Sequence, residues 1–110
     1  MNYAQQLLTR LKAAHGGASD YRIAQILEIS SQSVGKVTNG HNGFSDVTLN
    51  KIAQELGENP MLVIADYHIA TQDFPGMNNV WEHMKMLAMK EEMEKYQGVR
   101  EEKLGNVSGL

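Results

Sequence analysis

Two short helices joined by a tight turn are predicted by the stretch Asp20-Tyr-Arg-Ile-Ala-Gln-Ile-Leu-Glu-Ile-Ser-Ser-Gln-Ser-Val-Gly-Lys-Val-Thr-Asn39. Ala24 is a small residue at the place where the two helix backbones would approach each other. Ile29 supplies an apolar side chain that can fill the turn. Val34 and Val37 share one side of the second helix, which we expect to face the core. The opposite side of that helix is polar and is therefore expected to face outward.

One helix is predicted before this stretch. Its apolar residues recur at spacings of three and four, which is typical of a helix face: Tyr3, Ala4, Leu7, Leu8, Leu11 and Ala14. The pair Gly16-Gly17 ends it, because glycine adopts the left-handed conformation found at helix exits. Ser19 and Asp20 can cap the next helix, and Ser31 is expected to cap the one after it.

Two further helices are predicted after the stretch. Ser45 is a suitable N-cap for the first of them, with Asp46 beside the positive end of the helix dipole, and Gly57 ends it. Asn59-Pro60 begins the second, since proline at the first helical position loses no hydrogen bond. The segment MLVIADYHI in this helix is apolar nearly all round, so we expect it to be central to the core.

The C-terminal part is predicted to contain a linker at 71–78, a helix at 79–97 and a flexible tail at 98–110. Two apolar stripes follow the predicted helix: Met86, Met89, Met93 and Tyr96 on one, and Val80, Met84 and Leu87 on the other. The helix could fold back over the core. However, two stripes are difficult to bury on one small domain, so we expect this helix to mediate a homodimer or a higher homo-oligomer.

The stretch 20–39 and its flanking helices resemble the lambda-repressor and Cro family of helix-turn-helix proteins, over residues 3–70. The resemblance implies an all-α fold, with a five-helix lambda-repressor-like bundle at 1–70 and a separate C-terminal helix. It also implies a phage- or prophage-type transcriptional regulator that binds double-stranded DNA. Carried over by position, Ser31, Gln32 and Lys36 would face bases, and Ser30, Asn39, His41 and Asn42 would face phosphates.

Two positions depart from the family pattern. Asp20 stands where the family often has a glutamine that touches phosphate, and we therefore expect this carboxylate to act only as a cap. Glu28 stands at the turn position that is usually glycine, which implies strain if its backbone is left-handed.

Composition and charge narrow the possible functions. The net charge is −3, but five basic and four acidic residues in 1–57 give +1, whereas five basic and nine acidic residues in 58–110 give −4. The chain has no cysteine, and its four histidines lack the spacing of metal ligands. No set of nucleophile, base and acid can be assigned, so we expect neither enzyme activity nor a cofactor. Without a long apolar run or a signal-peptide pattern, a cytoplasmic protein with no membrane association is expected.

These features predict a DNA-binding regulator that acts as a homodimer on an inverted repeat. The resemblance implies that this regulator is a repressor. A protein-interaction module is the alternative. In that interpretation the acidic C-terminal half and its methionine-rich helix would bind another regulator, and the helix-turn-helix fold would not bind DNA.

Overall fold

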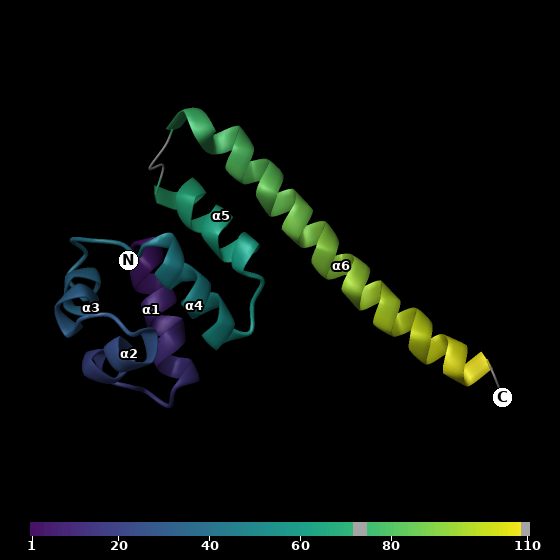
Figure 1. Ribbon diagram of the computed structural model, residues 1–110, viewed down its shortest axis with the longest axis horizontal. Helices are drawn as coiled ribbons and strands as arrows, with labels where there is room; N and C mark the ends of the chain where they lie inside the picture. Colours follow the sequence, from purple (N-terminus) through teal and green to yellow (C-terminus); the bar gives the residue numbers. More distant parts are fainter. Residues whose placement is uncertain (72–74, 109–110) are drawn as a thin grey trace.

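A computed structural model describes the backbone of residues 1–71 and 75–108 and the side chains of residues 1–71 and 76–95. Within these residues the chain is all-helical (Figure 1). The elements are α1 (Tyr3–Ala14), α2 (Asp20–Leu27), α3 (Ser31–Thr38), α4 (Asp46–Leu56), α5 (Pro60–Thr71), the short 3-10 helix η1 (Pro75–Met77) and α6 (Asn78–Ser108).

Polar side chains fix where the first four helices begin. Ser19 and Ser45 cap α2 and α4, as expected, by accepting hydrogen bonds from backbone N–H groups of the first turn. The N-cap of α3 is Ser30 rather than the expected Ser31, because Ser30 has the extended backbone of a cap and Ser31 is already helical. Asn2, which the sequence analysis did not single out, caps α1 in a reciprocal pair of hydrogen bonds with Gln5.

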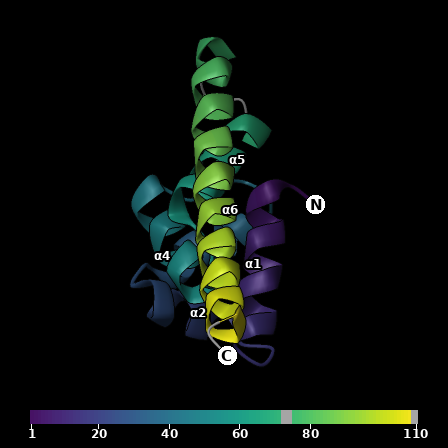
Figure 2. The same ribbon diagram turned by 90° about the vertical axis from the view of Figure 1, so that its right-hand side faces the viewer.

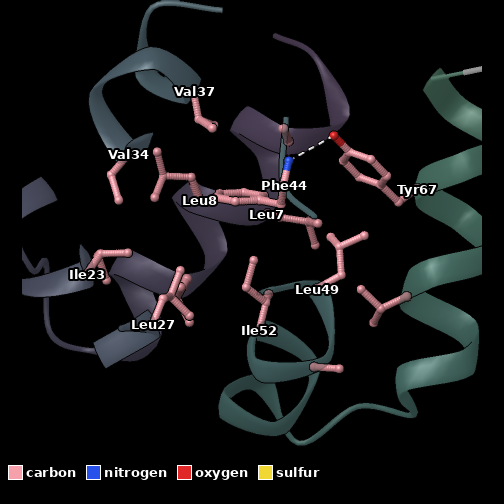
Figure 3. Close-up of a cluster of buried hydrophobic side chains, with 14 of the residues drawn as sticks. Leu7, Leu8, Ile23, Leu27, Val34, Val37, Phe44, Leu49, Ile52 and Tyr67 are labelled. Carbon is pink, nitrogen blue, oxygen red and sulfur yellow. Dashed lines mark hydrogen bonds between the residues drawn. The ribbon is translucent and has the colours of Figure 1, made fainter. Parts of the chain in front are cut away.

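The core lies where α1 to α5 converge, and Figure 3 shows leucine, isoleucine and valine side chains of α1 to α4 pointing toward one another, with Tyr67 of α5 beside them. Its largest fully buried side chains are Leu7, Leu11, Ile23, Leu27, Val34, Val37, Leu49 and Ile52. The predicted inward face of α3, with Val34 and Val37, is therefore correct. Ala14 is an exception on the predicted face of α1, because it is exposed in the last turn of α1, where the helix passes beyond the core.

α5 is the central helix that its composition predicted. Val63 and Tyr67 belong to the core on one side of α5. On its other side α5 is covered by α6, which runs in the opposite direction: Trp81 of α6 stacks on His68, and Lys85, about one turn further along α6, pairs with Asp66, two residues earlier in α5. Burial on both sides explains why this segment needs apolar residues nearly all round.

The boundaries in the C-terminal part differ from those expected. α6 continues to Ser108 instead of ending at residue 97, so the segment 98–108 of the expected tail is helical. A glycine inside a helix costs about 1 kcal/mol relative to alanine, which residues such as Arg100, Glu101 and Lys103, with strong helix propensity, can offset. The linker expected at 71–78 is shorter, because Thr71 ends α5 and Asn78 begins α6; residues 72–74 lie outside the described residues.

Candidate nucleic-acid interface

The turn between α2 and α3 is built on a left-handed residue. Glu28 has φ 58° and ψ 40°, and Ile29 N–H closes the turn by donating to the carbonyl of Ala24 at 3.0 Å. Lys51 of α4 lies 2.8 Å from the Glu28 carboxylate and also donates to the carbonyl of Leu27 at 3.2 Å. Its cation therefore lies at the negative end of the α2 dipole, where it is favourable. Lys51 explains how a glutamate is accommodated where glycine would be least strained, and the hydrogen bond from Lys51 lowers the pKa of Glu28.

Asp20 connects three helices at the other end of α2. It is the first residue of α2, following the cap, and its carboxylate pairs with Lys12 of α1 and accepts a hydrogen bond from the Thr38 hydroxyl of α3 at 3.1 Å. The expectation that Asp20 is only a cap was thus wrong: Ser19 is the cap, and Asp20 holds the start of α2 against the end of α3. With Lys12 beside it, this carboxylate is also less repulsive to a phosphate than its sequence position suggested.

The Asp20 pair predicts a pH-dependent contribution to stability. The hydrogen bond from Lys12 holds the pKa of Asp20 below its ordinary value of 3.8, so the contribution is complete above 3.8 and is lost as pH falls through the lower folded-state pKa. We expect Asp20→Asn to lower the free energy of unfolding at neutral pH by less than about 1 kcal/mol, because the pair is partly solvated. Urea denaturation of both proteins at neutral and acidic pH measures this. A difference that stays constant with pH would contradict it.

All seven residues expected to contact DNA are exposed and lie at the N-cap of α3, on α3 itself or on the loop 39–45 that follows it: Ser30, Ser31, Gln32, Lys36, Asn39, His41 and Asn42. In Figure 1 α3 is at the left edge of the molecule, and Figure 2 places α6 in front with the bundle behind it. The two views agree that α6 lies on the side of the bundle away from α3. The polar face of α3 is therefore not covered by α6.

Some of these side chains have structural roles as well. The Ser30 hydroxyl accepts the Ser33 backbone N–H at 3.1 Å, so one of its lone pairs is already used. Asn39 is the C-cap of α3, and the backbone N–H of His41 donates to the carbonyl of Lys36 at 2.9 Å. These bonds fix the exit of the chain from α3. Gln32 and Lys36 remain directed to solvent from the outer side of the helix.

The charges around α3 favour Lys36 as a phosphate or base ligand. Three of the five cations in residues 1–57 pair with carboxylates: Arg10 with Glu58, Lys12 with Asp20, and Lys51 with Glu28. Among the described side chains, Lys36 and Arg22 have no carboxylate within ion-pair distance. The two cations left for an external anion thus lie on α3 and at the start of α2.

The loop 39–45 is held by a tyrosine that the sequence analysis did not single out. Tyr67 of α5 accepts a hydrogen bond from the backbone N–H of Phe44 at 3.0 Å, and Figure 3 shows this contact. A Cβ atom at Gly43 would lie 1.6 Å from the Tyr67 hydroxyl oxygen. Gly43 is therefore required by close packing, a requirement that the local sequence His41-Asn42-Gly43 does not reveal.

Gly35 has no such structural requirement. It lies in the middle of α3, its backbone is not in the left-handed region, and a Cβ atom there would meet nothing within 4 Å. We expect Gly35→Ala to stabilise the free protein by about 1 kcal/mol, which is the difference in helix propensity. Urea denaturation checks this. Gly57→Ala is the matched control and should destabilise instead, because Gly57 has φ 68°. A neutral or destabilising Gly35→Ala would show that α3 is not a regular helix.

α6 combines the two arrangements considered from the sequence. Ala88 is fully buried against α5, Met84 is half-buried, and Trp81 stacks on His68, so one face of α6 covers the bundle. The remaining apolar side chains are exposed: Met86 (67%), Met89 (49%) and Met93 (61%) on one flank, and Val80 and Leu87 on the other. The side chain of Tyr96 lies outside the described residues. The exposed flanks are available to a partner.

No cluster of three or more histidine or acidic side chains suited to a metal ion is present among the described residues. Nor does any helix in the described part of the chain combine the length and the apolar character needed to span a bilayer. Comparison of the chain with protein-family models, with curated proteins and with solved structures finds no match. The exposed side chains on α3 and α6 are therefore the features of the molecule that point to a function.

Proposed function

We propose that this protein is a sequence-specific DNA-binding regulator of transcription that inserts α3 into the major groove. The observation that carries the proposal is the exposed outer side of α3, on which Gln32 and Lys36 stand without intramolecular partners among the described residues. An amide and a cation of this kind are suited to the hydrogen-bonding edges of bases in the major groove.

The geometry around α3 supports this proposal. Ser31 at the start of α3 would face bases, while Ser30, Asn39 and the loop residues His41 and Asn42 would face the phosphates. The Asp20 contacts to Lys12 and Thr38 fix α3 relative to α1 and α2. A rigid placement of this kind is needed, because base contacts require accurate positioning of the helix.

A homodimer formed through α6 is part of the proposal. One eight-residue helix with a single lysine reads few base pairs, and two-fold pairing would place a second α3 at a half-site about 34 Å away. The exposed methionines Met86, Met89 and Met93 provide the contact, since methionine packs adaptably at interfaces. The resemblance to the lambda-repressor and Cro family favours a repressor of phage or prophage type.

The test is fluorescence anisotropy of the purified protein with labelled DNA from upstream of its own gene, measured across a salt series. We expect selective binding to one fragment, with an affinity that falls as salt rises, because phosphate contacts release counterions. A scrambled fragment of equal length is the control for selectivity. Absence of binding to any promoter fragment at low salt would refute the proposal.

The dimer has its own test. Met89→Glu should raise the dimer dissociation constant at least tenfold, because it places a charge within an apolar contact, and sedimentation equilibrium measures this constant. Met61→Glu is the matched control, since Met61 is an exposed methionine on α5. If Met89→Glu and Met61→Glu leave the same dimer, then α6 is not the interface.

A second candidate function rests on the same exposed methionines. In this alternative the methionine flank of α6, in the acidic C-terminal half of the chain, binds another regulatory protein, and α3 does not bind DNA. A stable complex that survives both Gln32→Ala and Lys36→Ala, together with absent DNA binding, would favour this function. A partner that binds α6 and thereby prevents DNA binding would combine the two.

A further inference from the structure

Two adjacent residues of α5 reach the loop 39–45 and the start of α4. The Tyr67 hydroxyl oxygen accepts the Phe44 backbone N–H at 3.0 Å, and Tyr67 is almost completely buried. Its neighbour His68 places Nε2 2.7 Å from an oxygen of Asp46, the first residue of α4. The end of the loop is thus held by Tyr67, and the start of the helix that follows it by His68.

The same part of α5 is also the attachment point of α6. The rings of His68 and Trp81 stack with centroids 4.3 Å apart and planes inclined by 13°. Lys85, one turn further along α6, lies 2.7 Å from Asp66. The imidazole of His68 therefore contacts α6 on one side and Asp46 on the other, and the Tyr67 and His68 rings meet edge to face at 5.8 Å.

We propose that Tyr67 and His68 couple the position of α6 to the conformation of the loop 39–45. Side chains packed this closely cannot move independently, so a shift of Trp81 displaces His68 and, with it, Asp46 and the Tyr67 hydroxyl. The loop contains His41 and Asn42, and it directly follows Asn39 at the end of α3. A partner that repositions α6 would thereby change the geometry of the residues that follow α3.

As a regulatory device this inference rests on the proposed function, because it matters for DNA only if the loop contacts phosphates. Binding of a partner at α6 would then change the affinity for DNA through α5, in addition to the gain in affinity from joining two subunits. The coupling is reciprocal, so a DNA molecule held by the loop must in turn alter the surroundings of Trp81. Trp81 is the single tryptophan of the chain, and its fluorescence reports this change directly.

The first experiment needs no DNA. Hydrogen exchange at the Phe44 backbone N–H is followed by NMR in the wild type and in the Tyr67→Phe, Trp81→Ala and Lys85→Ala variants. Tyr67→Phe should accelerate exchange about tenfold, because it removes the acceptor of this N–H group. Trp81→Ala should accelerate it at least threefold, while exchange at the N–H of Ile52 in the core of α4 stays unchanged. His83→Ala, which removes an exposed α6 side chain outside the two apolar stripes, is the control and should have no effect.

The outcomes separate the coupling from the proposed function. If Trp81→Ala leaves exchange at Phe44 unchanged while Tyr67→Phe accelerates it, the coupling is refuted. If Trp81→Ala accelerates exchange everywhere, the smaller Lys85→Ala substitution is used instead, and unchanged exchange at Phe44 in that variant refutes the coupling.

The second experiment adds promoter DNA and records Trp81 fluorescence. Faster exchange at Phe44 together with no DNA binding by any protein supports the coupling and refutes only the proposed function. DNA binding with unchanged Trp81 emission refutes the coupling alone.

Discussion

Gly43→Ala is expected to destabilise the protein by about 2–3 kcal/mol, the range for overpacking a well-filled interior combined with a lost buried hydrogen bond. The added Cβ atom would lie 1.6 Å from the hydroxyl oxygen and 2.9 Å from Cζ of Tyr67. Tyr67 is only 5% exposed and belongs to the core, so its ring cannot swing aside into solvent. Either the loop or the ring must move, and both movements break the bond from Phe44 N–H. Urea denaturation of the variant measures the loss.

A double-mutant cycle with Tyr67→Phe identifies the cause of this loss. Removing the hydroxyl relieves the closest contact, so Gly43→Ala should cost less in the Tyr67→Phe background than in the wild type. Gly76→Ala is the control, because a Cβ atom there meets nothing within 4 Å. Equal costs of Gly43→Ala in the two backgrounds would mean that the Tyr67 hydroxyl does not limit the space at Gly43.

Replacing Gln32 and Lys36 together by alanine is expected to weaken binding to the selected promoter fragment by at least about 1000-fold, since each base contact contributes about 1 kcal/mol or more and a dimer loses both contacts twice, about 4 kcal/mol in total. Both side chains are exposed on α3, so the fold should be unchanged. Anisotropy measures the affinity, and urea denaturation verifies that stability is retained.

The two single variants should differ in kind. Lys36→Ala removes a cation and should reduce the salt dependence of binding, whereas Gln32→Ala should relax sequence preference and leave the salt dependence unchanged. The matched control is Gln54→Ala combined with Lys95→Ala, which removes the same chemical groups from exposed positions on α4 and α6. Equal weakening by the control would show that α3 is not the DNA-binding helix.

Helices α1 to α5 were predictable because their signals are local. A cap such as Ser45 acts within one turn, and a stripe such as Leu49 and Ile52 shows its period within one helix. The exposed side of α3 followed from the same reasoning, since placing Val34 and Val37 inward leaves Gln32 and Lys36 outside. For α3 the cap was misplaced by one position because Ser30 and Ser31 are adjacent and chemically identical.

The contacts between distant parts of the chain were not predictable in this way. Nothing local distinguishes Tyr67 as the residue that holds Phe44, or Lys51 as the residue that supports the turn at Glu28. The pairing of Trp81 with His68 depends on how α6 folds back along α5. One signal was present but not used: a helix apolar nearly all round needs cover on both sides, and only the C-terminal helix was left to supply it.

The exposed methionine side chains on one flank of α6 can be oxidised and reduced reversibly. The chain has seven methionines and no cysteine, so its oxidisable sulfur is entirely in thioethers. Met86, Met89 and Met93 present theirs to solvent on one side of one helix. Peroxide would turn these three apolar groups into polar sulfoxides, and methionine sulfoxide reductases would restore them. The face that is best suited to hold a partner is therefore also a face that oxidation would make polar and that reduction would restore.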